Sequence, residues 1–191
     1  MKRFHAMIDK CAGAPARERK KCERELWEKF GAEKTVMILD MSGFTVTVQR
    51  GGLVEFLLKI RAMHRVVRRE LRRHHGRLVK FEADNAYAVF DNPADAARAA
   101  VAMVEYFRGE REPEVSLSIG IAHGSILLVP RQDFFGDAVN LAGKLGEDLA
   151  GRDEILIDEK AVTPAMRHEF KLQKIRFNVS GVRIRCYQVM I

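Results

Sequence analysis

The chain has 191 residues, 47% of them hydrophobic, which is long enough to bury a core as one compact domain with an extension. Its 33 basic and 26 acidic residues give a net charge of +7. That charge suits an anionic ligand or partner without choosing among nucleotide, nucleic acid and membrane surface. The N-terminus lacks the apolar run of a secretory signal, and the longest uncharged run, residues 115–130, is too short to span a membrane, so we predict a soluble protein.

The three cysteines, Cys11, Cys22 and Cys186, are odd in number and widely spaced. This pattern matches neither a disulfide framework nor a metal-binding spacing. The six histidines show no ligand spacing with cysteine either, so we do not expect a zinc site. We predict reduced cysteines and a cytoplasmic location.

Residues 1–33 are predicted to form a charged helical extension to the main domain, which covers residues 34–191. Within the extension, residues 15–30 place apolar side chains on one helical stripe, and Gly31 follows as an expected C-cap. A short buried strand is expected over residues 35–39. A long amphipathic helix should follow over residues 53–74, because its apolar residues recur at three- and four-residue steps.

The second half of the chain predicts further strands and helices. Asn92 and Pro93 are an N-cap and a first helical residue, which begin a helix that runs to residue 108. The other expected elements are strands over 77–81 and 86–90, a hairpin of 115–122 with 125–129, a helix over 136–145, a strand over 155–157, and strands over 170–177 and 183–189. The order β-α-β-β-α-β with additions predicts an α+β fold, a ferredoxin-like core with extra C-terminal strands.

Two aspartates stand at the ends of predicted strands. Asp40 closes an apolar run and opens into the turn Gly43-Phe44-Thr45, and Asp84 lies between two strands. Divalent cations prefer oxygen ligands, and phosphate binds backbone N–H groups where a turn leads into a helix. Each aspartate alone is well explained as a turn residue. Together they predict a metal and phosphate site for nucleotide chemistry.

Three blocks of sequence, in the family's order across residues 34–190, resemble the class III adenylate/guanylate cyclase catalytic domain. The first is an aspartate followed three residues later by Gly-Phe-Thr. The second is a lysine four residues before another aspartate. The third is an aspartate, a glycine three residues on, Val-Asn, and a basic residue four beyond the asparagine. The matching residues are Asp40, Gly43, Phe44, Thr45, Lys80, Asp84, Asp133, Gly136, Asn140 and Lys144.

The resemblance implies a purine nucleotidyl cyclase that converts ATP to 3′,5′-cyclic AMP and pyrophosphate. Asp40 and Asp84 would hold two Mg²⁺ or Mn²⁺ ions, which activate the attacking 3′-oxygen and neutralise phosphate charge. The backbone around Gly43, Phe44 and Thr45 would cradle the β- and γ-phosphates.

The remaining family residues are implied to bind the nucleoside. Lys80 and Asp133 would read the purine edge, with lysine donating to adenine N1 and aspartate accepting from the 6-amino group; guanine presents the reverse pattern, so the pair favours ATP. Asn140 would orient the ribose, and Lys144 would stabilise the transferring phosphate. In the family these four come from the subunit that does not supply the metal aspartates, so we expect a homodimer with two shared sites.

The sequence departs from the family at three places. Position 144 is lysine instead of arginine, Ala83 replaces the glycine before Asp84, and residues 178–183 lack the lysine-glycine repeat that contacts the triphosphate. Basic residues that could substitute are Lys174, Arg183 and Arg185. The family pattern does not require Glu82 or Asp137, and we expect neither to have a role. Two alternatives stay open: a catalytically weak nucleotide-binding or regulatory module, and a cyclase for GTP or a pyrimidine nucleotide.

The predicted long helix also carries a basic face, which could bind nucleic acid or an anionic membrane. Its members are Arg61, Arg65, Arg68, Arg69, Arg72 and Arg73, with His64, His74 and His75. No aromatic residues are interleaved with these arginines, and the face lies opposite an apolar stripe. We therefore interpret it as a solvated helix face and do not expect nucleic-acid binding.

Overall fold

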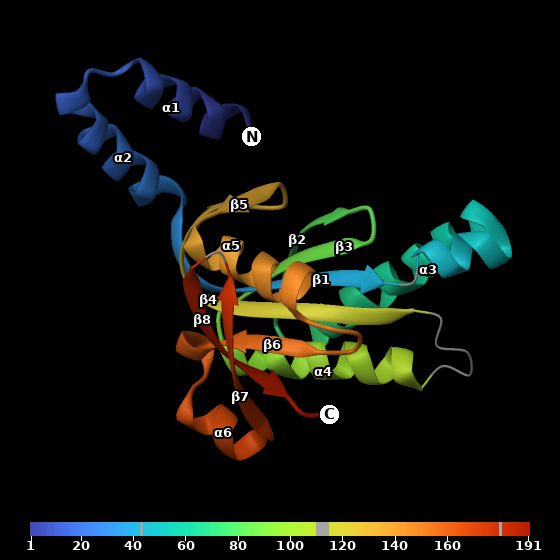
Figure 1. The fold of residues 1–191 in the computed structure, drawn as a ribbon. Helices are drawn as coiled ribbons and strands as arrows, with labels where there is room; N and C mark the ends of the chain where they lie inside the picture. Colours follow the sequence, from blue (N-terminus) through green and yellow to red (C-terminus); the bar gives the residue numbers. More distant parts are fainter. Residues whose placement is uncertain (43, 110–114, 180) are drawn as a thin grey trace.

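A single mixed sheet organises the computed structural model, which describes residues 1–42, 44–109, 115–179 and 181–191, with backbone only for residues 44–47 and 50. The sheet has the strand order β2-β3-β1-β4-β6-β8-β7, and β5 pairs with β4 (Figure 1). The strands are β1 (Gly31–Ser42), β2 (Arg77–Glu82), β3 (Asn85–Phe90), β4 (Ser116–Val129), β5 (Asp133–Phe135), β6 (Ile155–Asp158), β7 (Leu172–Val179) and β8 (Val182–Val189).

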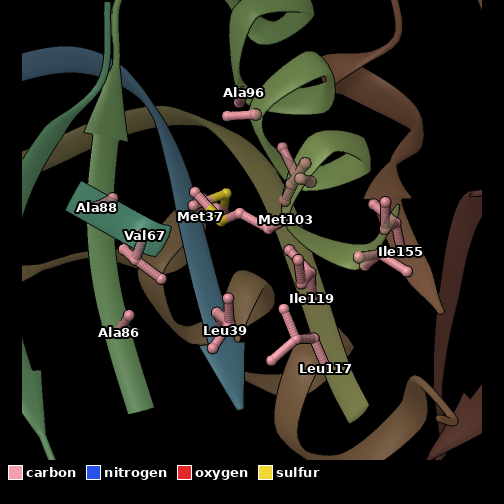
Figure 2. Close-up of a cluster of buried hydrophobic side chains, with 14 of the residues drawn as sticks. Met37, Leu39, Val67, Ala86, Ala88, Ala96, Met103, Leu117, Ile119 and Ile155 are labelled. Carbon is pink, nitrogen blue, oxygen red and sulfur yellow. The ribbon is translucent and has the colours of Figure 1, made fainter. Parts of the chain in front are cut away.

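Helices cover both faces of this sheet. On one face lie α3 (Phe44–Arg73) and α4 (Pro93–Arg108), and on the other α5 (Asp137–Gly143) and the π-helix η1 (Lys144–Leu149). Along β1 the side chains alternate between the faces, as strand geometry requires. Met37 and Leu39 pack with Met103 of α4 in the larger cluster (Figure 2), whereas Val36 and Ile38 pack toward α5. The core on both sides therefore fixes the direction in which β1 presents its carboxyl end.

The predicted ferredoxin-like α+β core is confirmed. The order β1-α3-β2-β3-α4-β4 gives β-α-β-β-α-β, and these four strands lie side by side as β2-β3-β1-β4. The strands β6, β7 and β8 extend the sheet beyond β4. The short helices η2 (Glu159–Ala161) and α6 (Pro164–Glu169) connect β6 to β7, and α6 had no counterpart among the predicted elements. Asn92 caps α4 as predicted, because its Oδ1 accepts from the Ala94 N–H at 3.0 Å.

Some sequence-based boundaries were wrong. The predicted hairpin of residues 115–122 with 125–129 does not form. Instead, Ser116–Val129 forms one long strand, β4, because β1 pairs with it continuously from Gly31 opposite Leu127 to Ser42 opposite Ser116. The long helix begins earlier than expected, at Phe44, and kinks at Gly52, where φ is +81°. The helix expected over residues 136–145 changes to π geometry at Lys144.

The N-terminal extension forms a helical hairpin of α1 (Lys2–Gly13) and α2 (Ala16–Phe30), seen apart from the sheet's helical layers in Figure 1. Cys11 and Cys22 form a disulfide across it, so the prediction that they are reduced and unpaired was wrong. The pairing arises because the turn between the helices brings the two Cα atoms to 5.5 Å, which their separation in sequence did not reveal. Phe4 anchors the hairpin by stacking on Phe135 of β5.

In the part of the chain that the structure describes, no helix is both long and apolar enough to cross a membrane. The third cysteine, Cys186, is a buried free thiol on β8, and burial raises its pKa to about 11. It is therefore a core residue in this fold rather than a reactive group.

Candidate active site

The two predicted metal aspartates lie together at one end of the sheet. Asp40 is near the end of β1, and Asp84 is in the β2–β3 turn. Because Leu39 of β1 pairs with Ala86 of β3, that turn is brought alongside Asp40. Burial raises the pKa of the Asp40 carboxyl, and the negative charge of Asp84 raises it further. Two carboxylates that repel one another in a half-buried position form a suitable place for a divalent cation.

The turn that carries Asp84 has an unusual backbone. Ala83 adopts φ +50°, in the left-handed region where glycine is normally found. This is the position at which the sequence replaces the expected glycine by alanine. The structure keeps the turn despite the side chain, at a cost of roughly 1–2 kcal/mol for a non-glycine residue in this region. The turn that carries Asp84 therefore accommodates alanine at this position.

A third carboxylate, Glu147 of η1, was missed by the sequence analysis. One of its oxygens accepts from Asn85 Nδ2 at 3.3 Å and from the Tyr87 hydroxyl at 3.3 Å. Its charge also contributes to the raised pKa of Asp40. Its position three residues after Lys144 could have suggested that the two side chains share a helix face. The π geometry of η1, however, departs from the α-helical spacing on which that prediction would depend. Among the described residues, no three His, Cys, Asp or Glu side chains converge as a complete metal site.

Lys80 and Asp133, predicted to act as a pair, are brought together by the fold. Lys80 Nζ lies 3.4 Å from Asp133 Oδ1, across from β2 to β5. It also lies 3.0 Å from Glu82 and 4.9 Å from the Tyr87 ring centroid. Partial burial lowers the pKa of Lys80, but the hydrogen bond to Glu82 and the charge of Asp133 outweigh it, so the pKa is raised. Glu82, for which we expected no role, is thus one of the two carboxylates beside this lysine.

Tyr87 contacts both Lys80, a member of the Lys80–Asp133 pair, and the third carboxylate, Glu147. Its ring lies beneath the Lys80 ammonium, and its hydroxyl reaches Glu147. Tyr87 thus links Lys80 to Glu147, whose charge in turn acts on Asp40. Beside Lys80 there is a hollow of about 740 Å³, which is lined by apolar side chains of β2, β3 and β4 together with the basic residues Arg68, Arg77, Lys80 and Arg131.

As far as the structure describes them, the remaining predicted site residues make no polar contact with the two aspartates. Asn140 is exposed on α5, and Lys144 Nζ forms an ion pair with Asp148 at 2.7 Å. Among the described residues, no polar contact joins either of them to Asp40 or Asp84. Gly43 lies outside the described residues, and for Phe44 and Thr45 only the backbone, at the start of α3, is described.

The family model of the adenylate and guanylate cyclase catalytic domain matches residues 29–190. The chain belongs to this cyclase family. An uncharacterised protein of Mycobacterium tuberculosis, Rv1319c, is 31% identical over 140 residues, which cover 65% of this chain and 26% of that protein. The chain spans about a quarter of the length of such curated relatives.

Solved structures of cyclase domains have the same fold. The catalytic core of a rhodopsin-guanylyl cyclase with converted specificity, in complex with ATPαS, superposes with a TM-score of 0.73 at 20% identity and covers 84% of this chain and 98% of that one. The adenylyl cyclase CyaB of Pseudomonas aeruginosa gives 0.70 at 18% identity, covering 84% and 96%. Both guanylyl and adenylyl cyclases are therefore among the structural neighbours of this cyclase-family chain.

In this cyclase-family chain, the segment that lacks the lysine-glycine repeat lies in the β7–β8 hairpin. The structure shows which of the three basic residues proposed to replace the repeat already have an acidic partner. Lys174 Nζ lies 2.5 Å from Glu159, and Arg185 lies 3.5 Å from the same carboxylate. Arg183 is exposed near the hairpin turn. Two of the three basic residues proposed from the sequence, Lys174 and Arg185, thus share a single carboxylate partner, Glu159.

Proposed function

We propose that this chain is a nucleotidyl cyclase that converts ATP to 3′,5′-cyclic AMP and pyrophosphate, with residues 34–191 as the catalytic domain. The observation that carries the proposal is the contact of Lys80 with Asp133 at 3.4 Å, on the same sheet as the interacting aspartates. Adenine can accept from Lys80 at N1 and donate from its 6-amino group to Asp133. Guanine offers the opposite pattern to the same two side chains.

The proposed roles of the aspartates agree with their electrostatics. Asp40 and Asp84 would hold the two divalent ions, Mg²⁺ or Mn²⁺, which when bound neutralise phosphate charge and favour the ionised 3′-oxygen. The fit rests on the raised pKa of Asp40, because a cation there relieves both its burial and its repulsion from Asp84 and Glu147. With only two converging aspartates, the remaining ligands would be phosphate oxygens and water.

The active site is proposed to be shared between two copies of the chain. Asn140 and Lys144 carry the expected roles of orienting the ribose and stabilising the transferring phosphate, yet neither contacts the aspartates of its own chain. A symmetric homodimer would bring Lys80, Asp133, Asn140 and Lys144 of one protomer to the aspartates of its partner, forming two equivalent sites.

A product assay tests the proposed reaction. The purified chain with Mn²⁺ is given ATP, GTP, CTP and UTP together, and the cyclic products are separated and quantified. Cyclic AMP is expected to dominate, because only adenine matches the Lys80–Asp133 pair. Dominance of cyclic GMP or of a pyrimidine product would reassign the base, and no product with any of the four would contradict the reaction.

The contact between Lys144 and Asp148 favours a second candidate, a nucleotide-binding or regulatory module with weak turnover. An amine held at 2.7 Å by Asp148 is partly neutralised, and a lysine offers one point charge where arginine offers a planar fork. If this candidate is right, wild-type turnover is negligible and Lys144→Arg raises it by tenfold or more, about the value of one added charge-assisted contact. Substantial wild-type turnover would exclude the candidate, and Arg24→Lys on α2 is the control for a remote lysine–arginine exchange.

A further inference from the structure

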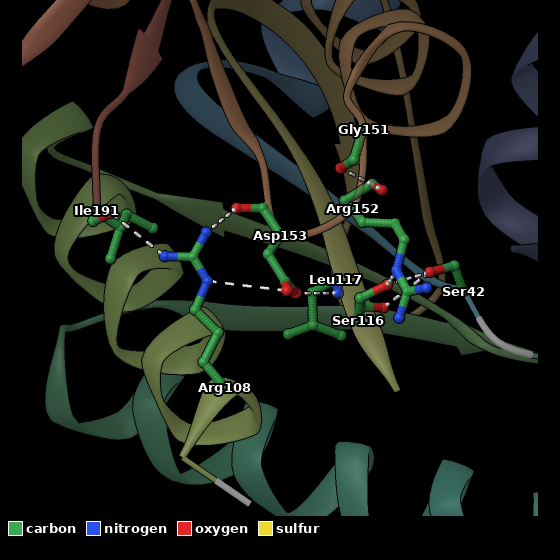
Figure 3. Close-up of polar contacts among 9 residues, drawn as sticks. Ser42, Arg108, Ser116, Leu117, Gly151, Arg152, Asp153 and Ile191 are labelled. Atoms are coloured by element: carbon green, nitrogen blue, oxygen red, sulfur yellow. Dashed lines mark hydrogen bonds and ion pairs between the residues drawn. The ribbon is translucent and has the colours of Figure 1, made fainter. Parts of the chain in front are cut away.

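The loop between η1 and β6, residues 151–153, is held by two hydrogen bonds from the beginning of β4 and one from α4 (Figure 3). Ser118 Oγ donates to the Gly151 carbonyl at 3.0 Å, and the Leu117 N–H donates to Asp153 Oδ1 at 3.1 Å. Arg108 of α4 donates to the Asp153 carbonyl at 3.2 Å. The backbone on both sides of Arg152 is therefore held in place.

Arg152 extends from this loop toward the end of β1. Its Nε donates to Ser116 Oγ at 3.2 Å, and Ser116 Oγ is hydrogen-bonded to Ser42 Oγ (Figure 3). In the β1–β4 register Ser42 pairs with Ser116, and Asp40 pairs with Ser118. The guanidinium thus lies beside Ser42, the last residue of β1, which is two positions after Asp40 and two before the start of α3.

The charge of Arg152 is not neutralised within the described residues. None of their carboxylates forms an ion pair with it, and its recorded hydrogen bond uses Nε alone. The side chain is exposed, so the terminal nitrogens can meet a ligand. By contrast, Lys174 and Arg185 of the C-terminal hairpin are both paired with Glu159.

We propose that Arg152 binds the β- and γ-phosphates of the nucleoside triphosphate, and then pyrophosphate, from the same protomer that supplies Asp40 and Asp84. The inference rests on the proposed function and supplies the cation that residues 178–183 lack. A guanidinium can donate two parallel N–H bonds to phosphate oxygens. In the described part of the chain, the Nη1 and Nη2 groups of Arg152 are free to do so, because only its Nε is bonded to Ser116.

The role of Arg152 in the reaction is to stabilise charge. The 3′-oxygen forms a bond to the α-phosphorus, and the bond from that phosphorus to the bridging oxygen breaks. Pyrophosphate leaves with the electron pair, and the hydroxyl proton is released to water. Negative charge grows on the departing pyrophosphate, where a fixed cation that keeps its own proton is most useful.

Binding of inorganic pyrophosphate with Mn²⁺, measured by calorimetry, tests the inference without turnover. The variants are Arg152→Ala and Arg152→Lys, with Arg183→Ala as the competing site and Arg24→Ala as a remote control for lost charge. Arg152→Ala is expected to weaken binding about tenfold, Arg152→Lys less, and both others very little. Wild-type affinity in Arg152→Ala, or a loss confined to Arg183→Ala, would overturn the inference.

Two further readouts separate this inference from the proposed function. In a working cyclase, Arg152→Ala should raise KM for ATP and lower kcat, while inhibition by cyclic AMP, which lacks the β- and γ-phosphates, stays unchanged. A wild type without turnover whose pyrophosphate affinity still depends on Arg152 would reject the function and keep the site. An unchanged melting temperature shows that the variant is folded. If Arg152→Ala does not fold, the pyrophosphate affinities of Arg152→Lys and Arg183→Ala are compared instead, and a loss in Arg183→Ala but not in Arg152→Lys would overturn the inference.

Discussion

Replacing Asp40 by asparagine is expected to lower cyclase turnover by about a thousandfold, since several kcal/mol of charge stabilisation depend on its metal ions. The same change removes a half-buried negative charge that Asp84 and Glu147 repel. We therefore expect the metal-free protein to become more stable, not less. Product formation and thermal unfolding, each with and without Mn²⁺, measure the two effects on the same samples.

The opposite signs of these effects make the Asp40 prediction specific. Mn²⁺ should raise the melting temperature of the wild type and of Asp9→Asn, an exposed carboxylate on α1, but not that of Asp40→Asn. If Asp40→Asn lost activity merely by unfolding, its metal-free melting temperature would fall. Equal stabilisation of all three proteins by Mn²⁺ would contradict the assignment of Asp40 as a metal ligand.

The Asp40 variant also tests the shared site. Asp40→Asn and Asn140→Ala should each be inactive, but a mixture that exchanges subunits contains heterodimers with one intact site. Random pairing of equal amounts is expected to restore about a quarter of wild-type activity, because half of the dimers each carry one of two sites. A mixture as inactive as its components would contradict the proposed homodimer.

Replacing Gly120 by alanine is expected to be the most damaging single-methyl change in the core. A Cβ at this position of β4 would lie 2.0 Å from the Ala142 carbonyl oxygen and 2.4 Å from the Gly146 nitrogen. Both are backbone atoms, so neither a rotamer change nor a small shift relieves the clash. We expect the free energy of unfolding to fall by roughly 3 kcal/mol, the upper range for overpacking. Urea denaturation monitored by circular dichroism measures it.

Gly124 on the same strand provides the matched control. A Cβ there meets only the Ala138 Cβ at 3.4 Å, an ordinary contact, so Gly124→Ala should change stability little. Gly120→Ala should also impair turnover in the molecules that remain folded, because it pushes away the α5–η1 junction that carries Lys144. Equal stability of the two variants would show that this close approach of helix to sheet is not required.

Local patterns in the sequence were enough to predict most of the helices and strands that form the core. The three- and four-residue spacing in α3 and the Asn92-Pro93 start of α4 each depend on neighbours within one element, and both predictions were confirmed. The hairpin predicted from residues 115–122 and 125–129 was wrong, because the long pairing of β1 with β4 outweighs a local preference for a turn. Strand length there is decided by a partner remote in the chain.

The candidate site also combines residues that local sequence motifs predict with residues that only the packing of remote segments brings together. Motif spacing identified Asp40, Asp84, Lys80 and Asp133 before any geometry was known, because each block lies within a few residues of sequence. Glu147 and Arg152 belong to no such block. They reach the site only because η1 has π geometry and because Ser118 and Leu117 hold the following loop against β4.

By itself, then, the sequence determined the cyclase family, the β-α-β-β-α-β core and the residues of the three motifs. The tertiary structure alone decided the Cys11–Cys22 disulfide, the contacts of Glu147 with Asn85 and Tyr87, and the placement of Arg152 beside Ser116. The physical reason is the range of the interactions. Motifs and helix periodicity are local, whereas a disulfide between two helices, a carboxylate of η1 bonded to β3, and an arginine of the η1–β6 loop bonded to β4 depend on which segments pack together.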